Sequence, residues 1–443
     1  MRPSPHLVRL LAIWSLLSLS LAIARPFDIG IGESLTTGWT VASITLLVAV
    51  LLDILSARTR AKMPEAQRSI PNSLSLGVDN TATLRIHNPS TLPITVEVMD
   101  HFPDMVEIKG LPRRFDLEPN AHATVPYTVR PLLRGEAVFD RISLRVYSRA
   151  GLWHAYCDRG EKSTVKIYPN FRSIANFRTL GLHQHVNHLG IHIQQKRGQG
   201  LDFHQLREFR DGDSMNQVDW KATSRMRKLI SREYQDERDQ DIIFLLDSGR
   251  RMHAMDGDLS HFDHVLNAFL LTSYVAIRQG DAVGLLSFAG DERWVRPQKG
   301  HSAVNTLLNH VYDLHSSTST TDYIDVARRI INGHHKRSLV ILITNLQDQD
   351  TDDLLMAVNL LTEHHAVIVA SLRESFLDEN LTRPIEDFEH ALNYAGTIEY
   401  TSFRKRMLQR IRKCGVTVTD SLPRHLHIEL INEYLAMKRR GVI

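Results

Sequence analysis

Two apolar runs end in oxygen-bearing side chains whose types suit a hard metal ion. The run at 241–252, DIIFLLDSGRRM, turns polar at Asp247, and the run at 339–350, LVILITNLQDQD, turns polar at Thr344 and Asn345. Carboxylate, hydroxyl and amide oxygens are ligands that Mg²⁺ accepts, usually together with several waters. If both runs are strands of one parallel sheet, their polar ends meet at its carboxyl edge. The first chemistry to test is therefore a magnesium site.

A second group matches in kind the acidic-plus-lysine set of metal-dependent nucleases, and it consists of Glu208, Asp213, Asp219 and Lys221. A nuclease-like, metal-dependent hydrolase is therefore an alternative function. The structural interpretation of the same stretch is an ion-pair and hydrogen-bond network that docks it on a sheet, with Trp220 as the apolar anchor. That network would be formed by Arg207, Glu208, Asp213, Asp219 and Arg225. We favour the network.

Other familiar catalytic signatures are missing from the sequence. It contains no GxxxxGK[ST], GxSxG or HExxH, so nucleotide hydrolysis, acyl transfer at a nucleophile elbow and zincin chemistry have no motif support. Cys157 and Cys414 lie far apart and outside any zinc-binding spacing, which excludes zinc fingers and a disulfide scaffold. We expect ordinary thiols in a reducing compartment, no catalytic residues and no cofactor.

The elements that must position the first group form an alternating pattern in the C-terminal half. Five strand-like runs, IIFLLD, AVGLLSFA, SLVILITN, AVIVASL and VTVTD, alternate with helical patterns such as the one at 261–280. Nearly continuous apolar runs separated by amphipathic helices are typical of a parallel sheet covered on both faces. The fold class is therefore α/β, with a doubly wound parallel sheet. Ligands of such folds bind at the carboxyl ends of the strands.

The preceding region at 67–170 has a different periodicity. Short runs with apolar residues at alternate positions, such as TATLRIHN and PITVEVMD, are separated by Asn, Pro and Gly. This pattern predicts strands with one buried face, at the spacing of an Ig-like β-sandwich. We interpret it as a spacer or interaction module without catalytic residues.

Two long apolar stretches at 7–24 and 38–55 are each about long enough to cross the ~30 Å hydrocarbon core as a helix. Arg2 precedes the first stretch, and Arg58, Arg60 and Lys62 follow the second, so positive charge places both flanks inside. A cleaved signal peptide ending in AIA before Arg25 is the alternative for the first stretch. In both cases the chain from about residue 58 onward faces the cytoplasm.

Length and composition support a multidomain, membrane-anchored protein. A chain of 443 residues exceeds one ordinary core, and we divide it at 1–62 (transmembrane hairpin), 63–172 (sandwich), 173–240 (charged segment) and 241–443 (α/β domain). A net charge of +3 gives no whole-chain argument for nucleic acid, so none is expected as a partner. The basic stretch at 404–413 is interpreted as a solvated helix face, with an acidic partner or lipid headgroups as the sharper alternatives.

A spaced signature in this chain resembles the bacterial family known as domain of unknown function 58. It comprises Gly200, Phe203, Leu206, Arg207, Glu208, Gly212, Asp213, Asp219, Trp220, Ala222, Ser224, Arg225, Arg232 and Glu233, followed by the strand ending at Asp247. The resemblance implies a von Willebrand factor A-like domain, which usually binds partners through a metal-ion-dependent adhesion site. It also implies a MoxR-type AAA+ ATPase partner and a bacterial inner-membrane location with cytoplasmic soluble domains.

The adhesion site of that fold uses D-x-S-x-S at the first strand end, a threonine from a later loop and an aspartate after another strand. Here Asp247 matches the first aspartate, Thr321 (or its neighbour Thr320) can supply the threonine, and Asn345 stands where the last carboxylate is expected. Gly249 and Arg251 replace the two serines, so two hydroxyl ligands are lost and a cation is gained. We therefore expect a degenerate site in which Arg251 pairs with Asp247, with Mg²⁺ binding as the alternative.

Overall fold

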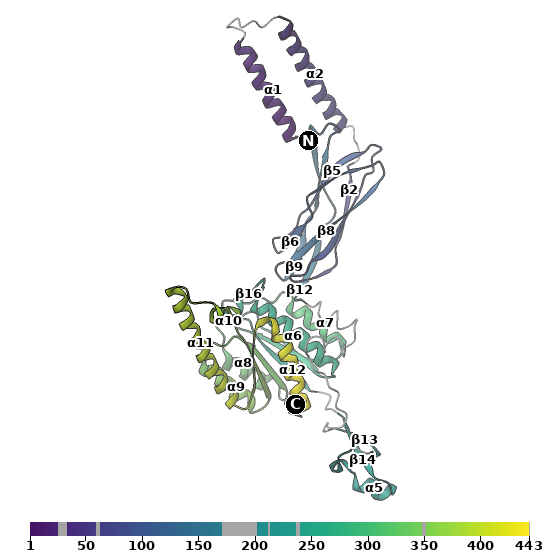
Figure 1. Ribbon diagram of the computed structural model, residues 1–443. Coiled ribbons are helices and arrows are strands. Elements are labelled where there is room, and N and C mark those ends of the chain that lie inside the picture. Colours follow the sequence, from purple (N-terminus) through teal and green to yellow (C-terminus); the bar gives the residue numbers. More distant parts are fainter. Residues whose placement is uncertain are drawn as a thin grey trace. The chain divides into compact units, whose positions relative to one another are not determined.

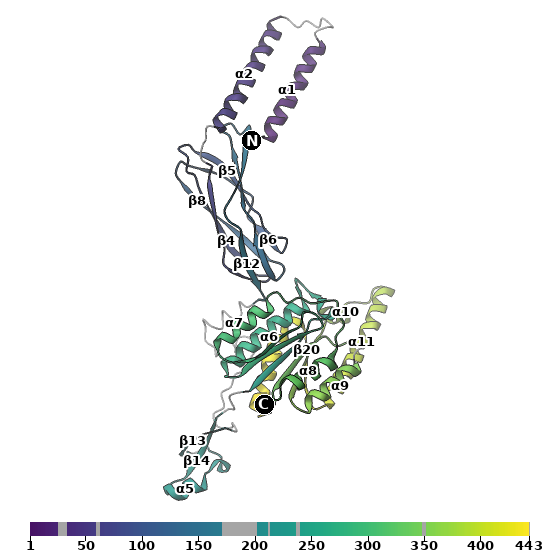
Figure 2. The same ribbon diagram turned by 180° about the vertical axis from the view of Figure 1, so that it is seen from behind.

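The computed structural model describes residues 1–24, 33–58, 63–170, 202–210, 213–235, 240–347 and 351–442. These residues form two units, Met1–Ile167 and Tyr168–Ile443. Figure 1 and Figure 2 colour them from purple at the N-terminus to yellow at the C-terminus. Each unit has its own sheets.

The first unit begins with two apolar helices, α1 (Pro5–Ala24) and α2 (Glu33–Arg58). Their windows Pro5–Ile23 and Thr36–Leu55 have mean hydropathies of 1.8 and 2.1, and both helices are long and apolar enough to cross a membrane. Trp14 and Trp39 stack between them, with ring centroids 4.2 Å apart. The two predicted apolar spans are therefore both helical.

Asp53, near the end of α2, is buried rather than directed to solvent. Its carboxylate accepts hydrogen bonds from the Ser148 hydroxyl at 2.6 Å and from the Ala150 amide at 3.0 Å. The loop that follows strand β10 (Ile142–Tyr147) thus satisfies the one acidic group in this part of α2. The neighbouring β-structure therefore holds the Asp53 carboxylate through hydrogen bonds.

Twelve strands accompany these helices. They are β1 (Arg2–Pro3), β2 (Glu65–Ser69), β3 (Ser73–Ser75), β4 (Asn80–His87), β5 (Ile94–Asp100), β6 (Val106–Lys109), β7 (Arg113–Leu117), β8 (His122–Pro131), β9 (Gly135–Phe139), β10, β11 (Trp153–Arg159) and β12 (Ser163–Tyr168). The sheets have the orders β1-β11-β10-β5-β7, β2-β4-β8-β6 and β3-β12-β9. Neighbouring strands such as β10 and β11, β5 and β10, β4 and β8, and β9 and β12 pair antiparallel.

Alternate residues of these strands are buried, which confirms the predicted period of two. β5, for example, buries every second residue from Ile94 to Asp100. Asp100 is fully buried and accepts hydrogen bonds from Arg68 Nε of β2 at 2.9 Å and from the Tyr127 hydroxyl of β8 at 2.6 Å. Because β5 belongs to one sheet and β2 and β8 to another, these bonds join two sheets across a shared interior.

The second unit is built on a six-stranded sheet of order β19-β18-β15-β20-β21-β22. Its strands are β15 (Asp241–Asp247), β18 (Ala282–Phe288), β19 (Arg293–Gln298), β20 (Leu339–Thr344), β21 (Ala366–Leu372) and β22 (Thr417–Ser421). All neighbours pair in parallel except β18 and β19. The five predicted strands are thus confirmed, and the antiparallel edge strand β19 was not predicted.

Helices cover both faces of this sheet, as the pictures show (Figure 1, Figure 2). One apolar core joins the sheet to α6 (His261–Arg278), α7 (His301–Val311) and α12 (Leu426–Arg439). The other core joins it to α8 (Tyr323–Gly333), α9 (Thr351–Thr362) and α11 (Phe388–Lys413). Successive residues of β15 alternate between the two cores, so the strand is buried on both sides. This is a doubly wound α/β arrangement.

The remaining elements lie before and between these. β13 (Asp202–Glu208) and β14 (Ile230–Gln235) pair antiparallel, and the chain between them carries η2 (Met215–Gln217) and α5 (Trp220–Met226). We call the described residues 202–210 and 213–235 the β13–β14 excursion. The others are η3 (Arg250–His253), β16 (Met255–Asp256), β17 (Leu259–Ser260), α10 (Ser375–Thr382) and η5 (Pro423–His425).

Helix α6 begins with a capping box. Ser260 Oγ accepts a hydrogen bond from the Asp263 amide at 3.1 Å, while the Asp263 carboxylate accepts one from the Ser260 amide at 3.0 Å. Ser260→Ala is expected to lower the stability of the α/β unit by about 1–2 kcal/mol, because a helix N-terminal donor loses its acceptor. Thermal melting by circular dichroism measures this, and Ser302→Ala within α7 serves as the control. A loss as small as that of the control would contradict the prediction.

His365, immediately before β21, is 4% exposed, and both its ring nitrogens lack a hydrogen-bond partner among the described residues. Burial, reinforced by His334 and His364, lowers its pKa from 6.5 to about 4. The folded state therefore resists protonation, and the α/β unit loses stability as the pH falls from 6.5 towards 4. His365→Phe is expected to reduce this loss in melts at about pH 7 and pH 5. The same substitution at exposed His335 should not, and an unchanged pH dependence in His365→Phe would refute the prediction.

Candidate functional site

The candidate site lies at the carboxyl edge of the parallel sheet, where four neighbouring strands end in polar side chains. β15 ends at Asp247 and β20 at Thr344, with Asn345 next in the chain. Glu374 follows β21 by two residues, and Asp420 lies near the end of β22. Parallel pairing in register brings these ends to one edge. The sequence placed Asp247 and Asn345 here but did not anticipate Glu374 or Asp420.

Asp247 is fully buried, and its carboxylate is surrounded by donors. Oδ2 accepts a hydrogen bond from the Thr344 hydroxyl at 2.6 Å and a longer one from the Tyr323 hydroxyl at 3.4 Å. Oδ1 accepts from the Gly249 amide at 2.9 Å and the Thr321 hydroxyl at 3.1 Å. The structure thus brings the predicted Thr321 to Asp247, as a hydrogen-bond donor.

Burial raises the pKa of Asp247, because the charged carboxylate is removed from water. The hydrogen bonds from Thr344, Gly249 and Thr321 oppose this effect, and so does the positive charge of Arg251. The same burial, together with the charge of Asp247, raises the pKa of the Tyr323 hydroxyl well above its usual value. These donors and the nearby guanidinium therefore offset part of the cost of burying the carboxylate.

Gly249 shows why a serine is missing from this edge. A Cβ at this position would lie 2.9 Å from Thr321 Oγ1, 3.0 Å from the Ser319 carbonyl oxygen and 3.1 Å from Asp247 Oδ1. Real side chains essentially never make the shortest of these contacts without displacing their neighbours. A serine hydroxyl could therefore enter only if the hydrogen bonds of Asp247 were rearranged.

Arg251 lies inside this edge rather than in solvent. It is 7% exposed, and its Nη1 donates to the carbonyl oxygen of Asn345 at 3.4 Å. Its charge also lowers the pKa of Asp247 against the effect of burial, so the guanidinium acts on the carboxylate electrostatically. A direct ion pair between Arg251 and Asp247 stays a prediction. The residues present do not fit Mg²⁺, since Gly249 and Arg251 supply no oxygen ligand and the added charge is positive.

Asn345 connects this group to a second buried charge. Its Oδ1 accepts a hydrogen bond from Arg404 at 3.4 Å, and its Nδ2 donates to Glu374 at 2.7 Å. Arg404, on α11, is 2% exposed and donates through Nη2 to Asp420 at 2.7 Å and through Nη1 to the Leu346 carbonyl oxygen at 3.0 Å. Asn345 therefore connects two groups of polar side chains. Its backbone carbonyl contacts Arg251, near Asp247, and its side-chain amide contacts Arg404.

Arg404 corrects the interpretation of the basic stretch at 404–413 as one solvated face. Its guanidinium also donates to the Ser371 hydroxyl and the Leu372 carbonyl oxygen. The spacing contained the signal, because Arg404 precedes the buried residues Met407, Leu408 and Ile411 by three, four and seven positions. The stretch is solvated at exposed positions such as Arg410 but not at Arg404.

The proposed nuclease-like carboxylates of the β13–β14 excursion have separate cationic partners. Arg207 holds Asp213 through two hydrogen bonds of 2.7 and 2.8 Å. Lys228 donates to Glu208 at 2.9 Å, and this bond is the main cause of the lowered pKa of Glu208. These pairs lie within the excursion, and docking of the segment on a sheet stays a prediction.

Asp219 has a structural position at the start of α5. It accepts from the Ala222 amide at 3.0 Å and from Arg232 Nε at 2.8 Å. The Ala222 bond, followed by Arg232, holds the pKa of the Asp219 carboxyl below its usual range. Asp219 therefore acts as a helix cap tied to β14.

Two of the predicted network members do not fulfil their assigned roles. Trp220 is 64% exposed, so its interpretation as an apolar anchor is wrong. Arg225 is exposed on α5, and Lys221 is exposed beside it. Across the parts of the chain described above, no group of three or more His, Cys, Asp or Glu side chains is arranged to hold a metal. Asp348 and Asp350, which follow β20, lie outside the described residues.

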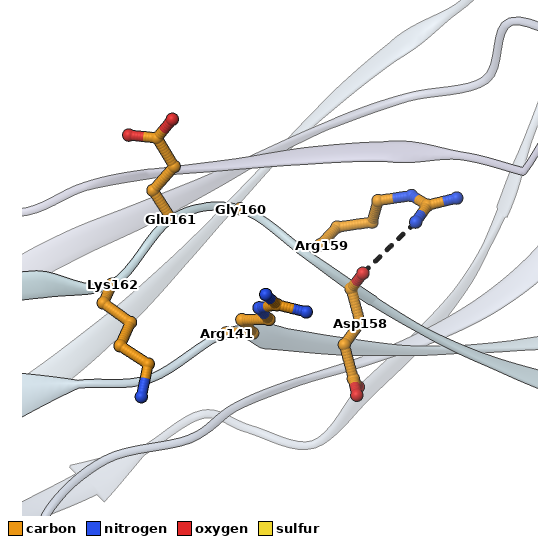
Figure 3. A pocket seen from close by; sticks show the side chains of 6 residues that line it. All are labelled: Arg141, Asp158, Arg159, Gly160, Glu161 and Lys162. Carbon is orange, nitrogen blue, oxygen red and sulfur yellow. Dashed lines mark hydrogen bonds between the residues drawn. The ribbon is translucent and has the colours of Figure 1, made fainter.

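The first unit has a shallow pocket of its own on the β-structure (Figure 3). Its volume is about 470 Å³, and it is lined by Arg141, Asp158, Arg159, Gly160, Glu161 and Lys162. Arg159 donates to the carbonyl oxygen of Asp158 at 3.2 Å, and the Asp158 carboxylate accepts from Ser143 at 2.6 Å. Charges of both signs line it, so it does not select one charged ligand.

The fold and the polar sheet edge define a mixed α/β protein with two N-terminal apolar helices. Residues 205–415 match the family described as "Protein of unknown function DUF58". The family resemblance predicted from the spaced signature is therefore confirmed. No curated protein matches the chain.

Several solved structures resemble parts of the chain. An aerotolerance-related membrane protein from Bacteroides fragilis is 18% identical, with 44% of this chain and 98% of that one covered and a TM-score of 0.29. Proximal thread matrix protein 1 from the mussel byssus is 15% identical, with 45% and 46% covered and a TM-score of 0.28. Native alpha-2-macroglobulin from Escherichia coli is 20% identical, with 25% and 17% covered and a TM-score of 0.22. Nothing about function follows from likenesses at this level.

Proposed function

We propose that this chain is a membrane-anchored interaction protein rather than an enzyme. In this proposal α1 and α2 cross the bacterial inner membrane, and the soluble units face the cytoplasm. A MoxR-type AAA+ ATPase works with the chain in the assembly or maintenance of envelope complexes. The α/β unit is a von Willebrand factor A-like domain whose adhesion site no longer depends on a metal.

One observation carries the interaction role. At the sheet edge where α/β proteins bind ligands, Asp247 is saturated by protein donors, and a buried guanidinium stands close by in place of an added cation. Asp247, with donors on both of its oxygens, is poorly placed to act as a metal ligand or as a general base. The same edge can still present a fixed surface to a partner.

The hydrolase alternative is less well supported. It requires Glu208, Asp213 and Asp219 to share a metal, yet each carboxylate accepts from a different cationic side chain. Hydrogen bonds lower the pKa of all three carboxyls, chiefly from Lys228 for Glu208, from Arg207 for Asp213 and from the Ala222 amide for Asp219. Lowered pKa values suit permanent charge rather than proton transfer. We therefore propose no catalytic role for this group.

The membrane part of the proposal depends on charge as well as length. The two helices satisfy the length and hydropathy of membrane spans, and basic residues flank them at Arg2 and Arg58. Positive flanks favour the cytoplasmic side. The cytoplasmic placement would bring the soluble units to the compartment where an AAA+ ATPase finds ATP.

Co-purification tests this function. The tagged full-length chain is extracted from native membranes in mild detergent, and bound proteins are identified with and without ATP. We expect specific enrichment of an AAA+ ATPase, and weaker enrichment after Arg404→Met or Arg251→Ser than after the surface control Arg328→Glu. The proposal fails if no ATPase is enriched while the purified chain alone turns over a phosphodiester with Mg²⁺ or Mn²⁺.

A further inference from the structure

The tip of the β13–β14 excursion exposes large apolar side chains next to a run of cations. Residues 220–229, WKATSRMRKL, contain no acidic residue. The exposed members are Trp220, Lys221, Arg225, Met226, Arg227, Lys228 and Leu229. We call this set the basic tip. A tryptophan, a methionine and a leucine exposed together are unusual on a surface that stays in water.

The local fold of the excursion does not depend on these side chains. Asp219 caps α5, and the Thr223 hydroxyl accepts from the Ile230 amide at 3.0 Å. Val218 and Ile230 supply the buried apolar contacts, while the Arg207–Asp213 pair fixes the chain before α5. The basic tip is thus displayed by a structure that other residues hold in place.

A second exposed tip has the opposite charge. Residues 385–392, IEDFEHAL, join α10 to α11 and contain no Lys or Arg. Phe388 is 83% exposed and Leu392 is 63% exposed. The exposed members are Ile385, Glu386, Asp387, Phe388, Glu389 and Leu392. We call this set the acidic tip.

The acidic tip stands on a helix that extends past the body of its unit. The buried residues of α11 all lie from Thr397 onward, so its first nine residues contribute none to the core. Figure 2 shows this first part of α11 standing clear of the strands. Asp387 caps the helix by accepting from the His390 amide at 2.7 Å, which fixes the start of the exposed turn. The tip is therefore an ordered projection with nothing packed on its apolar side chains.

We infer that the basic tip of one copy of this chain docks on the acidic tip of a second copy. Each tip carries three large apolar side chains. The basic tip has four cations, of which Lys228 already pairs with Glu208, and the acidic tip has three carboxylates. Matching apolar groups with a complementary charged rim are what a specific interface requires. Trp220 and Phe388 are both exposed.

This pairing is heterologous, since different surfaces of the two copies meet. A docked pair leaves one basic and one acidic tip unused, and the contact therefore propagates into a ring or a row of copies. Anionic lipid could neutralise the basic tip but would repel the acidic one. Further copies of the same chain can cover both kinds of tip, so the occupant we assign is a second copy. The inference goes beyond the proposed ATPase partnership and does not require it.

Mixed cross-linking tests the contact directly. Ser224→Cys is placed in one full-length chain and Asn393→Cys in another that carries a different tag, both with Cys157→Ser and Cys414→Ser. These exposed positions adjoin the tips without removing any of their apolar or charged groups. After mixing in neutral detergent and treatment with a short bis-maleimide, we expect a product that carries both tags. Raising the salt concentration should reduce its yield.

Charge reversal supplies the matched controls. Lys221→Glu with Arg225→Glu in the first chain is expected to reduce the mixed product at least tenfold, and Glu386→Lys with Glu389→Lys in the second chain should restore it. Arg328→Glu and Glu363→Lys, at exposed positions elsewhere on the unit, should leave the yield unchanged. As a further sample, one chain carries both cysteines. The inference is overturned if this chain cross-links within itself while the mixture of the two single-cysteine chains gives no product with both tags. It is also overturned if the mixed product forms only with anionic lipid, or if charge reversal leaves its yield unchanged.

Discussion

Replacing Arg404 with methionine is expected to lower the stability of the α/β unit by about 3–5 kcal/mol, because it breaks a buried ion pair and leaves the other charge without its partner. Asp420 loses two hydrogen bonds, of 2.7 and 3.1 Å, and the Leu346 carbonyl oxygen loses one of 3.0 Å. Asn345 also loses a donor to its side-chain oxygen. Methionine fills similar space but satisfies none of these acceptors.

Hydrogen exchange measured by mass spectrometry on the full-length chain in detergent localises this loss. The opening free energies of β20, β21 and β22 should all fall, since the guanidinium contacts residues in or just after each strand. Arg410→Met is the matched control on the same helix. Arg410 is largely exposed and pairs with Asp352 at 3.1 Å, so its removal should cost less than about 1 kcal/mol. Equal effects of the two substitutions would mean that Arg404 is not the centre of this network.

The sequence predicted the framework of this unit well because its signals are repetitive. Continuous apolar runs such as IIFLLD can be buried on both faces only within a covered parallel sheet, and all five became strands. The edge strand β19 was not predicted because its sequence, RWVRPQ, is polar and contains Pro297. Gly284 allows its close approach, since a Cβ there would lie 2.6 Å from the Val295 carbonyl oxygen. Such backbone proximity leaves little trace in composition.

The candidate site was predictable only in part. The strand-end pattern identified Asp247 and Asn345, and the family resemblance added Thr321. In the structure Thr321 donates a hydrogen bond to Asp247, and the backbone carbonyl of Asn345 accepts one from Arg251. Arg404 was missed because its buried partners come from strands far away in sequence. The role of Trp220 was wrong for a related reason. An aromatic residue beside ion pairs suggests an anchor, yet burial depends on what the tertiary structure places over it.

Arg251→Ser is expected to lower the stability of the α/β unit by about 3 kcal/mol in metal-free buffer, because Asp247 loses a nearby opposite charge while it stays buried. Burial already raises the pKa of Asp247. A folded-state pKa above the unfolded value means that the folded state binds the proton more tightly, so the deficit should be present at neutral pH and shrink as the pH falls. Melts over that range measure the effect, and Arg250→Ser, at the exposed neighbouring position, is the control.

The same substitution is also expected to create a metal dependence. It removes the competing cation and restores one hydroxyl of the D-x-S-x-S pattern, while Gly249 keeps the second ligand position closed. A weak site is therefore expected, and a Kd of about 1 mM would return about 1.4 kcal/mol at about 10 mM Mn²⁺. Mn²⁺ binding followed by electron paramagnetic resonance provides a direct readout. If the unaltered chain bound Mn²⁺ as tightly as Arg251→Ser and was stabilised as much, the guanidinium could not be standing in place of the ion.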